Sequence, residues 1–171
     1  PRGQTEEEER QWTKELLENP KERYEHEVVF QHIFQALLHL CLSVDVQEQT
    51  QILKLSKVQH LYRKMSGFLK EDISDGHILN TLYTTPAIGG EPASAVLDQI
   101  NHFESFDRGF YTGPIGWLGS EEADLAVGIR SALVADPQLH LFSGSGIVNG
   151  ALPKAEWKEI ENKIAAILHL F

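Results

Sequence analysis

The sequence predicts an α+β fold, with helices early in the chain, antiparallel strands later and a closing helix. Apolar residues recur every three or four positions between residues 29 and 40, which is typical of a helical stripe. Apolar runs of strand length occur within residues 111–142, and Asp136-Pro137 is typical of a turn between two of them. Pro153 then begins the final helical stretch, because proline favours the first position of a helix.

Helix boundaries are signalled by capping residues and prolines. The Thr5-x-x-Glu8 spacing of a capping box begins the first helix, and Asn19-Pro20 separates it from a longer second one. Helices are expected over residues 5–19, 20–42, 74–83, 93–103 and 153–170, with a loop rich in proline and glycine at 84–92.

The strands are expected to be short, except for one strongly apolar run. Their expected ranges are 52–55, 58–62, 111–118, 125–134 and 139–142. No internal repeat or low-complexity linker interrupts residues 1–171, so the chain is expected to be part of a single domain.

Composition excludes several classes of function. The chain has 171 residues, of which 42% are hydrophobic and 23% charged, as in ordinary globular proteins. A formal net charge of −10 argues against a nucleic-acid partner, and no apolar run is long enough to span a bilayer. A single cysteine and no apolar leader favour a reducing compartment, so a cytoplasmic location is expected, or the plastid stroma in a plant.

Two carboxylate pairs stand out. Glu22 and Glu25 are three residues apart on the second helix, and Glu156 and Glu159 are three apart on the last, with Lys163 four residues further on. These spacings place each set on one face of its helix. If the two faces met, they would form an oxygen-rich pocket suited to Mg²⁺. Pairs with this spacing are more often solvated helix surface, so spacing alone leaves both interpretations open.

Other residues could bind an anion. Arg130 is expected in an apolar strand, where a buried charge needs an anionic partner from the protein or from a ligand. An exposed strand end is the alternative, and the sequence leaves it open. Tyr111 could donate to the same anion or belong to the core. Gly144 and Gly146 flank Ser145 before the last helix, where backbone N–H groups could receive a carboxylate or simply form a tight turn.

The histidines and the cysteine give weaker signals. The eight histidines form no metal-ligand pattern. His60 is a hydrogen-bonded strand residue or a catalytic one, and the sequence leaves both open. Cys41 is expected in the core on the stripe of the second helix.

Seven short segments resemble, in order, the motifs of the chorismate-binding enzymes, and the resemblance covers essentially the whole chain. It implies the C-terminal part of that family's fold, an antiparallel sheet with flanking helices, with the N-terminal half of the domain missing. The segments are Pro1-Arg2-Gly3, Lys21-Glu22-Arg23-Tyr24-Glu25-His26, Val58-Gln59-His60-Leu61, residues 106–116, Ile129-Arg130-Ser131-Ala132, residues 143–148 and Glu156-x-x-Glu159-x-x-Asn162-Lys163.

The residues of two segments resemble the isochorismate synthase branch of this family. The segment Thr85-Pro86-Ala87-Ile88-Gly89-Gly90 is similar to that branch's version. In the amine-transferring synthases, the resemblance implies a hydroxylated residue at the position of Ala87. Tyr111-Thr112-Gly113-Pro114-Ile115-Gly116-Trp117 favours the same branch. The resemblance therefore implies an isomerase that converts chorismate to isochorismate for menaquinone, siderophore or salicylate synthesis.

The resemblance also implies roles for the residues singled out above. Glu25 and Glu159 resemble the principal Mg²⁺ ligands, and Glu22 and Glu156 resemble carboxylates that act through water. Arg130 and Tyr111 resemble the residues that bind the enolpyruvyl carboxylate, and the backbone of Gly144 and Gly146 lies beside them in the family. Ala87 resembles a residue of the substrate site, and Lys163 resembles a residue near the metal. His60 resembles a polar residue that lines the site, and a catalytic role for it is left open.

The reaction needs more than these residues. Water adds at ring C2 while the C4 hydroxyl leaves, which requires a general base and a general acid. In the family, a lysine and a glutamate fill these roles. The resemblance implies that both correspond to positions upstream of Pro1. The chain alone is therefore expected to be inactive and to need the missing half of its own domain.

The sequence leaves three alternatives open. A salicylate synthase, which carries isochorismate on to salicylate and pyruvate, is similar in sequence. An amine-transferring chorismate enzyme is a more distant possibility, and Ala87 argues against it. A non-catalytic remnant that keeps the fold as a binding module is a third, although Glu25, Glu159, Arg130 and Lys163 are all retained.

Overall fold

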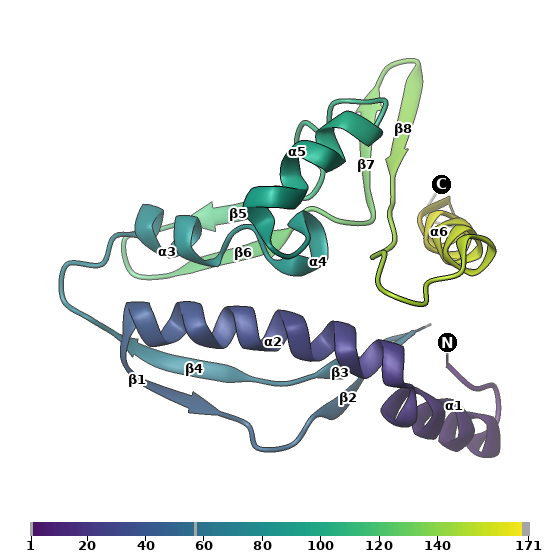
Figure 1. Cartoon of the computed structure of the whole chain (residues 1–171), viewed down its shortest axis with the longest axis horizontal. Helices are drawn as coiled ribbons and strands as arrows, with labels where there is room; N and C mark the ends of the chain where they lie inside the picture. The colour runs from purple at the N-terminus through teal and green to yellow at the C-terminus, as the bar shows by residue number, and fades with distance from the viewer. Residues whose placement is uncertain (1, 57, 169–171) are drawn as a thin grey trace. The chain divides into compact units, whose positions relative to one another are not determined.

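The computed structural model describes residues 2–56 and 58–168 and confirms the α+β class (Figure 1). The chain divides into two compact units, Pro1–Ala87 and Ile88–Phe171, and each is described by itself. Pro1 of the first resembling segment and the expected helix end near residue 170 lie outside the described residues. None of the helices in the described part of the chain is long and apolar enough to cross a membrane.

In the first unit, capping residues fix where the two long helices begin. Helix α1 (Glu6–Glu18) begins with the predicted capping box, in which the Thr5 hydroxyl accepts from the Glu8 N–H. Asn19 ends α1 and also caps α2 (Pro20–Leu40), because its side-chain oxygen accepts from the N–H groups of Lys21 and Glu22. These local interactions explain why the expected boundary at Asn19-Pro20 is confirmed.

The four strands of the first unit form two antiparallel pairs. Strand β1 (Cys41–Val46) pairs with β4 (Met65–Leu69), and β2 (Gln51–Lys54) pairs with β3 (Gln59–Tyr62). Helix α2 lies along β1 and β4, and Phe30, Ala36 and Leu40 of α2 are buried (Figure 1). Strands β2 and β3 confirm the prediction, whereas β1 and β4 were missed, and Cys41 is buried in β1 rather than on a helix.

The segment before α1 is held by a charged cluster. The guanidinium of Arg2 donates to the Glu9 carboxylate at 2.7 Å and to the Leu55 carbonyl at 2.5 Å, and Lys54 lies 3.1 Å from the same carboxylate. The Gly3 N–H donates to Glu9 at 2.8 Å, and a Cβ at Gly3 would lie 2.2 Å from the Glu9 nitrogen. Only glycine therefore fits at this close approach.

Helix α3 (Asp75–Leu82) belongs to the first unit, the short helix α4 (Pro86–Gly89) spans the boundary between Ala87 and Ile88, and α5 (Ala93–Phe103) belongs to the second unit. Helix α3, capped by Ser74, and α5 confirm the expected helices. The expected loop at 84–92 also contains α4.

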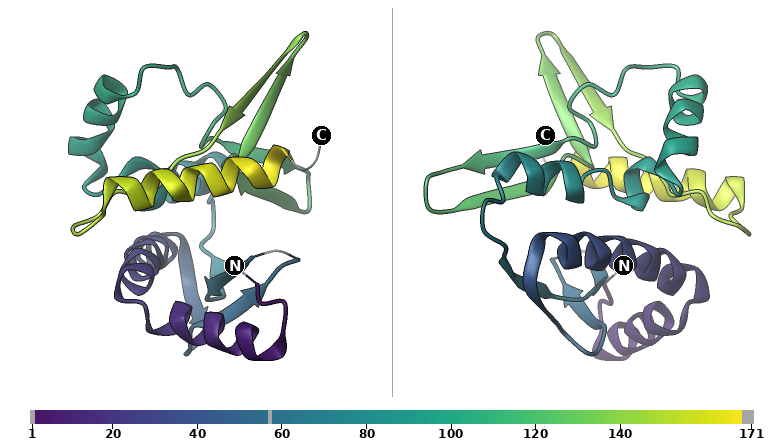
Figure 2. Two further views of the ribbon diagram at one scale, coloured as in Figure 1. Left: turned by 90° about the vertical axis from the view of Figure 1, so that its right-hand side faces the viewer. Right: turned by 60° about the vertical axis from the view of Figure 1, so that its left-hand side comes forward.

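The strands of the second unit form two separate hairpins that point in different directions (Figure 1, Figure 2). Strand β5 (Pro114–Leu118) pairs with β6 (Ala123–Val127), and β7 (Ser131–Ala135) pairs with β8 (Gln138–Phe142). Helix α6 (Pro153–Leu168) contacts β8. The turn at Asp136-Pro137 is confirmed, because these residues connect β7 and β8.

Two expected strands differ from the structure. The strand expected at 111–118 begins only at Pro114, because Tyr111 to Gly113 form a turn in which the Tyr111 N–H donates to the Arg108 carbonyl at 2.8 Å. The continuous strand expected at 125–134 is wrong. It ends at Val127 and restarts at Ser131, because Arg130 has the left-handed backbone angle φ of 50°.

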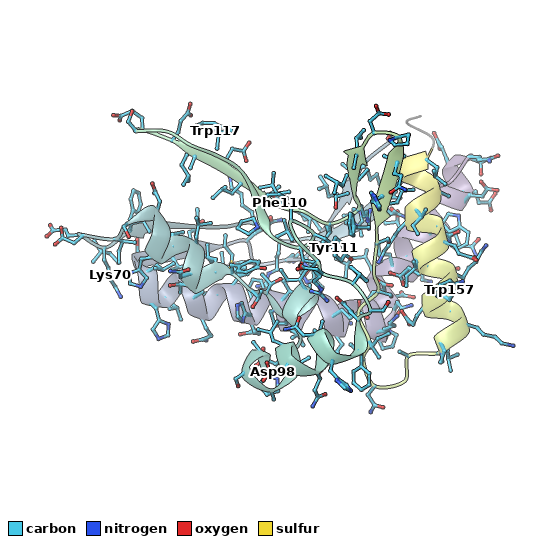
Figure 3. All side chains as sticks on the ribbon, turned by 90° about the horizontal axis from the view of Figure 1, so that it is seen from above. Lys70, Asp98, Phe110, Tyr111, Trp117 and Trp157 are labelled. Atoms are coloured by element: carbon cyan, nitrogen blue, oxygen red, sulfur yellow. The ribbon has the colours of Figure 1, made fainter. Side chains whose placement is uncertain are left out.

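The β5–β6 hairpin exposes both of its faces. Every residue of the two strands is exposed, and Trp117 on this hairpin has half of its surface in contact with solvent (Figure 3). Large apolar side chains on both faces of a hairpin are typical of a surface that another segment covers.

We predict that acid weakens the cluster around Glu9. The hydrogen bond from Arg2, followed by that from the Gly3 backbone, lowers the pKa of Glu9 from 4.5 to about 2. The folded state holds this carboxylate charged, so its stabilising effect is present above pH 4.5 and is lost as the pH falls towards 2. The free energies of unfolding of wild-type protein and Glu9→Gln, measured by urea titration, should converge as the pH falls over this range. A difference between the two that does not change with pH would contradict the assignment. Glu7→Gln on the same exposed helix turn is the matched control.

Candidate functional site

The residues proposed for binding and catalysis fall into two groups, one in each unit. The first group lies on α2 and β3, and the second lies on α6, on the loop before it and around Tyr111.

In the first unit, α2 and β3 form an open pocket of about 280 Å³. Because Asn19 and Pro20 begin α2, Glu22 lies in its first turn, and Glu25 and His26 follow one turn later. His60 of β3 also lines this pocket. The structure therefore brings Glu22, Glu25 and His60 to one pocket.

Gln59, which the sequence did not single out, anchors the pocket. It is buried in β3, and its side-chain oxygen accepts from the Thr13 hydroxyl of α1 at 2.9 Å. This bond ties α1 to the strand that carries His60. A polar residue beside His60 was the only sequence signal for it.

Charges around the pocket are arranged unevenly. Lys21 Nζ lies 3.6 Å from Glu25 Oε1, which is a buried atom. Burial lowers the pKa of His26; the nearby Glu27 carboxylate opposes this shift, and the Arg63 guanidinium adds to it. The His26 ring is therefore neutral near pH 7 and can accept a hydrogen bond on one nitrogen.

In the second unit, Lys163 connects the glycine loop, residues 143–146, to α6. Its ammonium group lies 2.6 Å from Glu159 Oε1 on the same helix and donates to the Gly144 carbonyl at 2.9 Å. Residues four apart on a helix are neighbours, which explains the ion pair. The glycine loop and the carboxylate face of α6 therefore form one assembly.

A second contact joins the same loop and helix. Glu156 has only 5% of its surface exposed, and the Ser145 hydroxyl donates to Glu156 Oε2. Glu156 lies in the first turn of α6, where the helix dipole favours a negative charge. Ser145 was not singled out from the sequence, although it stands between the two glycines that were.

Tyr111 lies against the glycine loop. Its ring stacks on Phe142 of β8 with centroids 5.5 Å apart, and a Cβ at Gly144 would lie 2.8 Å from Tyr111 Oη. Burial raises the pKa of Tyr111; the Arg108 guanidinium opposes this shift, and the Glu104 carboxylate adds to it. The phenol therefore keeps its proton at neutral pH and can donate it in a hydrogen bond.

The other proposed substrate residues are on the surface of the second unit or close to its beginning. Arg130 is exposed in the bend between β6 and β7, and among the described residues its side chain makes no ion pair or hydrogen bond. The interpretation of Arg130 as a buried strand residue is therefore wrong, although an exposed guanidinium can still bind an anion. Ala87 is exposed in α4, and Gly146 is exposed in the glycine loop.

The described residues fit Mg²⁺ by the chemistry of their donors. No group of three or more His, Cys, Asp and Glu in the described ranges could by itself hold a metal ion. Mg²⁺, however, usually takes one or two carboxylates and completes its shell with water and ligand anions. Lys163 contacts Oε1 of Glu159, and in the part of the chain that the structure describes no hydrogen bond or ion pair involves Oε2. That oxygen is a suitable donor.

Comparisons with known proteins match this chain to chorismate-binding enzymes. A family model described as chorismate binding enzyme matches residues 1–171. The chain is 41% identical to isochorismate synthase 2 of Arabidopsis thaliana over 166 residues, which is 96% of this chain and 30% of the relative. In the curated relatives it matches, the chain spans 29% to 43% of their own length.

Solved structures agree on the fold. DhbC of Bacillus anthracis, described as an isochorismate synthase, superposes with a TM-score of 0.91 at 32% identity, over 99% of this chain and 46% of that one. Anthranilate synthase component I of Streptococcus pneumoniae superposes with a TM-score of 0.84 at 26% identity, over 92% of this chain and 37% of that one. The fold is thus shared by more than one branch of enzymes.

We predict that Gly144 and Gly146 differ in their tolerance of a side chain. Gly144→Ala should destabilise the protein by about 1 kcal/mol, because its Cβ meets the Tyr111 hydroxyl and Tyr111 is held by Phe142. Gly146→Ala is the matched control, since no described atom lies within 4 Å of its Cβ, and it should stay within about 0.5 kcal/mol. Urea unfolding measures both. Equal effects would show that Tyr111 does not support the loop.

Proposed function

Because the chain belongs to the family of chorismate-binding enzymes, we propose that its protein is an isochorismate synthase that converts chorismate to isochorismate with Mg²⁺. The observation that carries this proposal is the family match over all 171 residues, together with relatives that are named isochorismate synthases. The chain is a minor part of those relatives, so the activity is proposed for the whole protein.

We propose Glu25 and Glu159 as ligands of Mg²⁺, with Glu22 and Glu156 acting through water. Glu25 lies in the polar pocket of α2 and β3, and Glu159 has an oxygen not engaged by Lys163. When bound, Mg²⁺ would neutralise the ring carboxylate of chorismate and polarise the ring for substitution.

Binding of the second carboxylate is assigned to Arg130, Tyr111 and the glycine loop. The protonated phenol of Tyr111 and the exposed guanidinium of Arg130 are both donors that suit a carboxylate. The backbone N–H groups near Gly144 and Gly146 add neutral donors. Tyr111 already touches the loop at Gly144, which supports their joint role.

Lys163 and His60 are proposed as site residues without the main proton transfers. The ammonium of Lys163 is held by a carboxylate and a carbonyl, which suits a fixed positive charge better than a base. His60 lines the polar pocket and can order water or substrate hydroxyls there. The base that activates water and the acid that protonates the leaving hydroxyl are assigned to the remainder of the domain.

Several finer points belong to the same proposal. The product would serve menaquinone, siderophore or salicylate synthesis, and the partner of this chain is the other half of its own domain. The exposed faces of the β5–β6 hairpin are suited to such a partner. A cytoplasmic or plastid location fits the single cysteine.

A related branch is the main alternative. The similarity to anthranilate synthase component I shows that the fold does not separate the branches. Ala87 argues against an amine-transferring enzyme, while salicylate synthase differs only in carrying the product further. A non-catalytic remnant would keep the fold and form no product.

Product analysis of the full-length protein separates these possibilities. With chorismate and Mg²⁺ we expect isochorismate as the product by NMR, and no turnover after chelation with EDTA. Salicylate and pyruvate would indicate the salicylate branch, an aminated product with ammonia the amine-transferring branch, and unchanged chorismate a remnant. Any of these three results would contradict the proposal.

Arg130→Ala tests the assignment of the carboxylate grip. We expect the apparent KM for chorismate to rise at least about 10-fold, because one charged hydrogen-bonding group is worth about 1.5–3 kcal/mol. The melting temperature should stay unchanged, since Arg130 is exposed. Arg23→Ala, an exposed arginine on α2, is the control. An unchanged KM would remove Arg130 from the substrate site.

A further inference from the structure

Ser145 is the described residue that connects the glycine loop to a buried acid. Its hydroxyl donates to Oε2 of Glu156, eleven residues away, on a side chain with 5% of its surface exposed. A buried carboxylate has few rotamers available, and a charged hydrogen bond fixes one oxygen in direction as well as distance. Ser145 therefore helps to fix the orientation of the Glu156 carboxylate.

The loop that carries Ser145 is itself held in place. The Gly144 carbonyl, one residue before Ser145, accepts from the Lys163 ammonium, and Lys163 also pairs with Glu159. Glu156 and Glu159 are thus contacted by the same loop and helix assembly, one through Ser145 and the other through Lys163. A hydroxyl on a loop anchored in this way can orient a carboxylate reproducibly.

A neighbouring serine makes the contrast sharp. Ser143 lies two residues before Ser145 in the same loop, and its hydroxyl is buried without a hydrogen-bond partner among the described residues. The two serines share the loop and the chemistry but differ in their contact with a carboxylate.

We propose that Ser145 is a positioning residue that orients Glu156 for Mg²⁺ binding through water. It touches neither substrate nor metal, and acts through the carboxylate of Glu156. This inference rests on the proposed function, because it assigns Glu156 to the metal site. Groups that orient metal-binding carboxylates typically change metal affinity 10–100-fold when removed.

Calorimetric titration of the full-length protein with Mg²⁺ alone tests this role without turnover. We expect Ser145→Ala to weaken Mg²⁺ binding about 10-fold. Ser145→Thr keeps the hydroxyl and should restore affinity to within about 3-fold of wild type. Ser143→Ala should leave it unchanged. Because Ser145 acts through Glu156, the double variant Ser145→Ala/Glu156→Gln should bind no more weakly than Glu156→Gln alone.

The outcomes separate the inference from the function it rests on. If wild-type protein binds no Mg²⁺, the proposed function and this inference both fail. If wild-type protein binds Mg²⁺ and Ser145→Ala binds equally well, only the inference is overturned. A Ser145→Ala variant with a lower melting temperature but wild-type affinity would show that the contact merely staples the loop. Additive effects in the double variant would also overturn it.

Discussion

The ammonium group of Lys163 is the contact on which the second unit's site depends. By binding the Gly144 carbonyl and the Glu159 carboxylate, it fixes the glycine loop onto α6. The Ser145 hydroxyl can then reach Glu156, and Gly144 can lie against the Tyr111 hydroxyl. Tyr111 in turn stacks on Phe142 of β8, so the carboxylates of α6 and the phenol are held by one connected set of contacts.

The first unit reaches a similar result with neutral groups. Asn19 caps α2, which places Glu22 and Glu25 on one face at its beginning. The bond between Thr13 of α1 and buried Gln59 ties β3, and hence His60, to α1, and His60 lines the same pocket as Glu22 and Glu25. Each unit thus presents a pair of glutamates on a helix whose first turns are fixed by neighbouring structure. Fixed carboxylates bind a metal ion at a smaller cost in ordering than mobile ones.

Local sequence signals predicted much of the fold. The capping box at Thr5, the boundary at Asn19-Pro20 and the start at Pro153 depend on neighbouring residues alone, and all are confirmed. Strand β1 was missed because it follows α2 directly, without glycine or proline. The long strand through Arg130 was wrong because its apolar pattern carries no sign of the left-handed bend at that residue.

The site was less accessible to local reasoning. The spacing of the glutamates is more often that of an ordinary solvated helix surface, and only the order of the resembling segments favoured a metal site. The contact of Ser145 with Glu156 joins a loop to a helix, so it depends on tertiary structure that no spacing in the sequence encodes.

The assignment of Glu25 and Glu159 is tested most directly by Mg²⁺ calorimetry on the full-length protein. We expect one Mg²⁺ per chain in wild type and at least about 10-fold weaker binding in both Glu25→Gln and Glu159→Gln. Wild-type affinity in either variant would contradict the assignment.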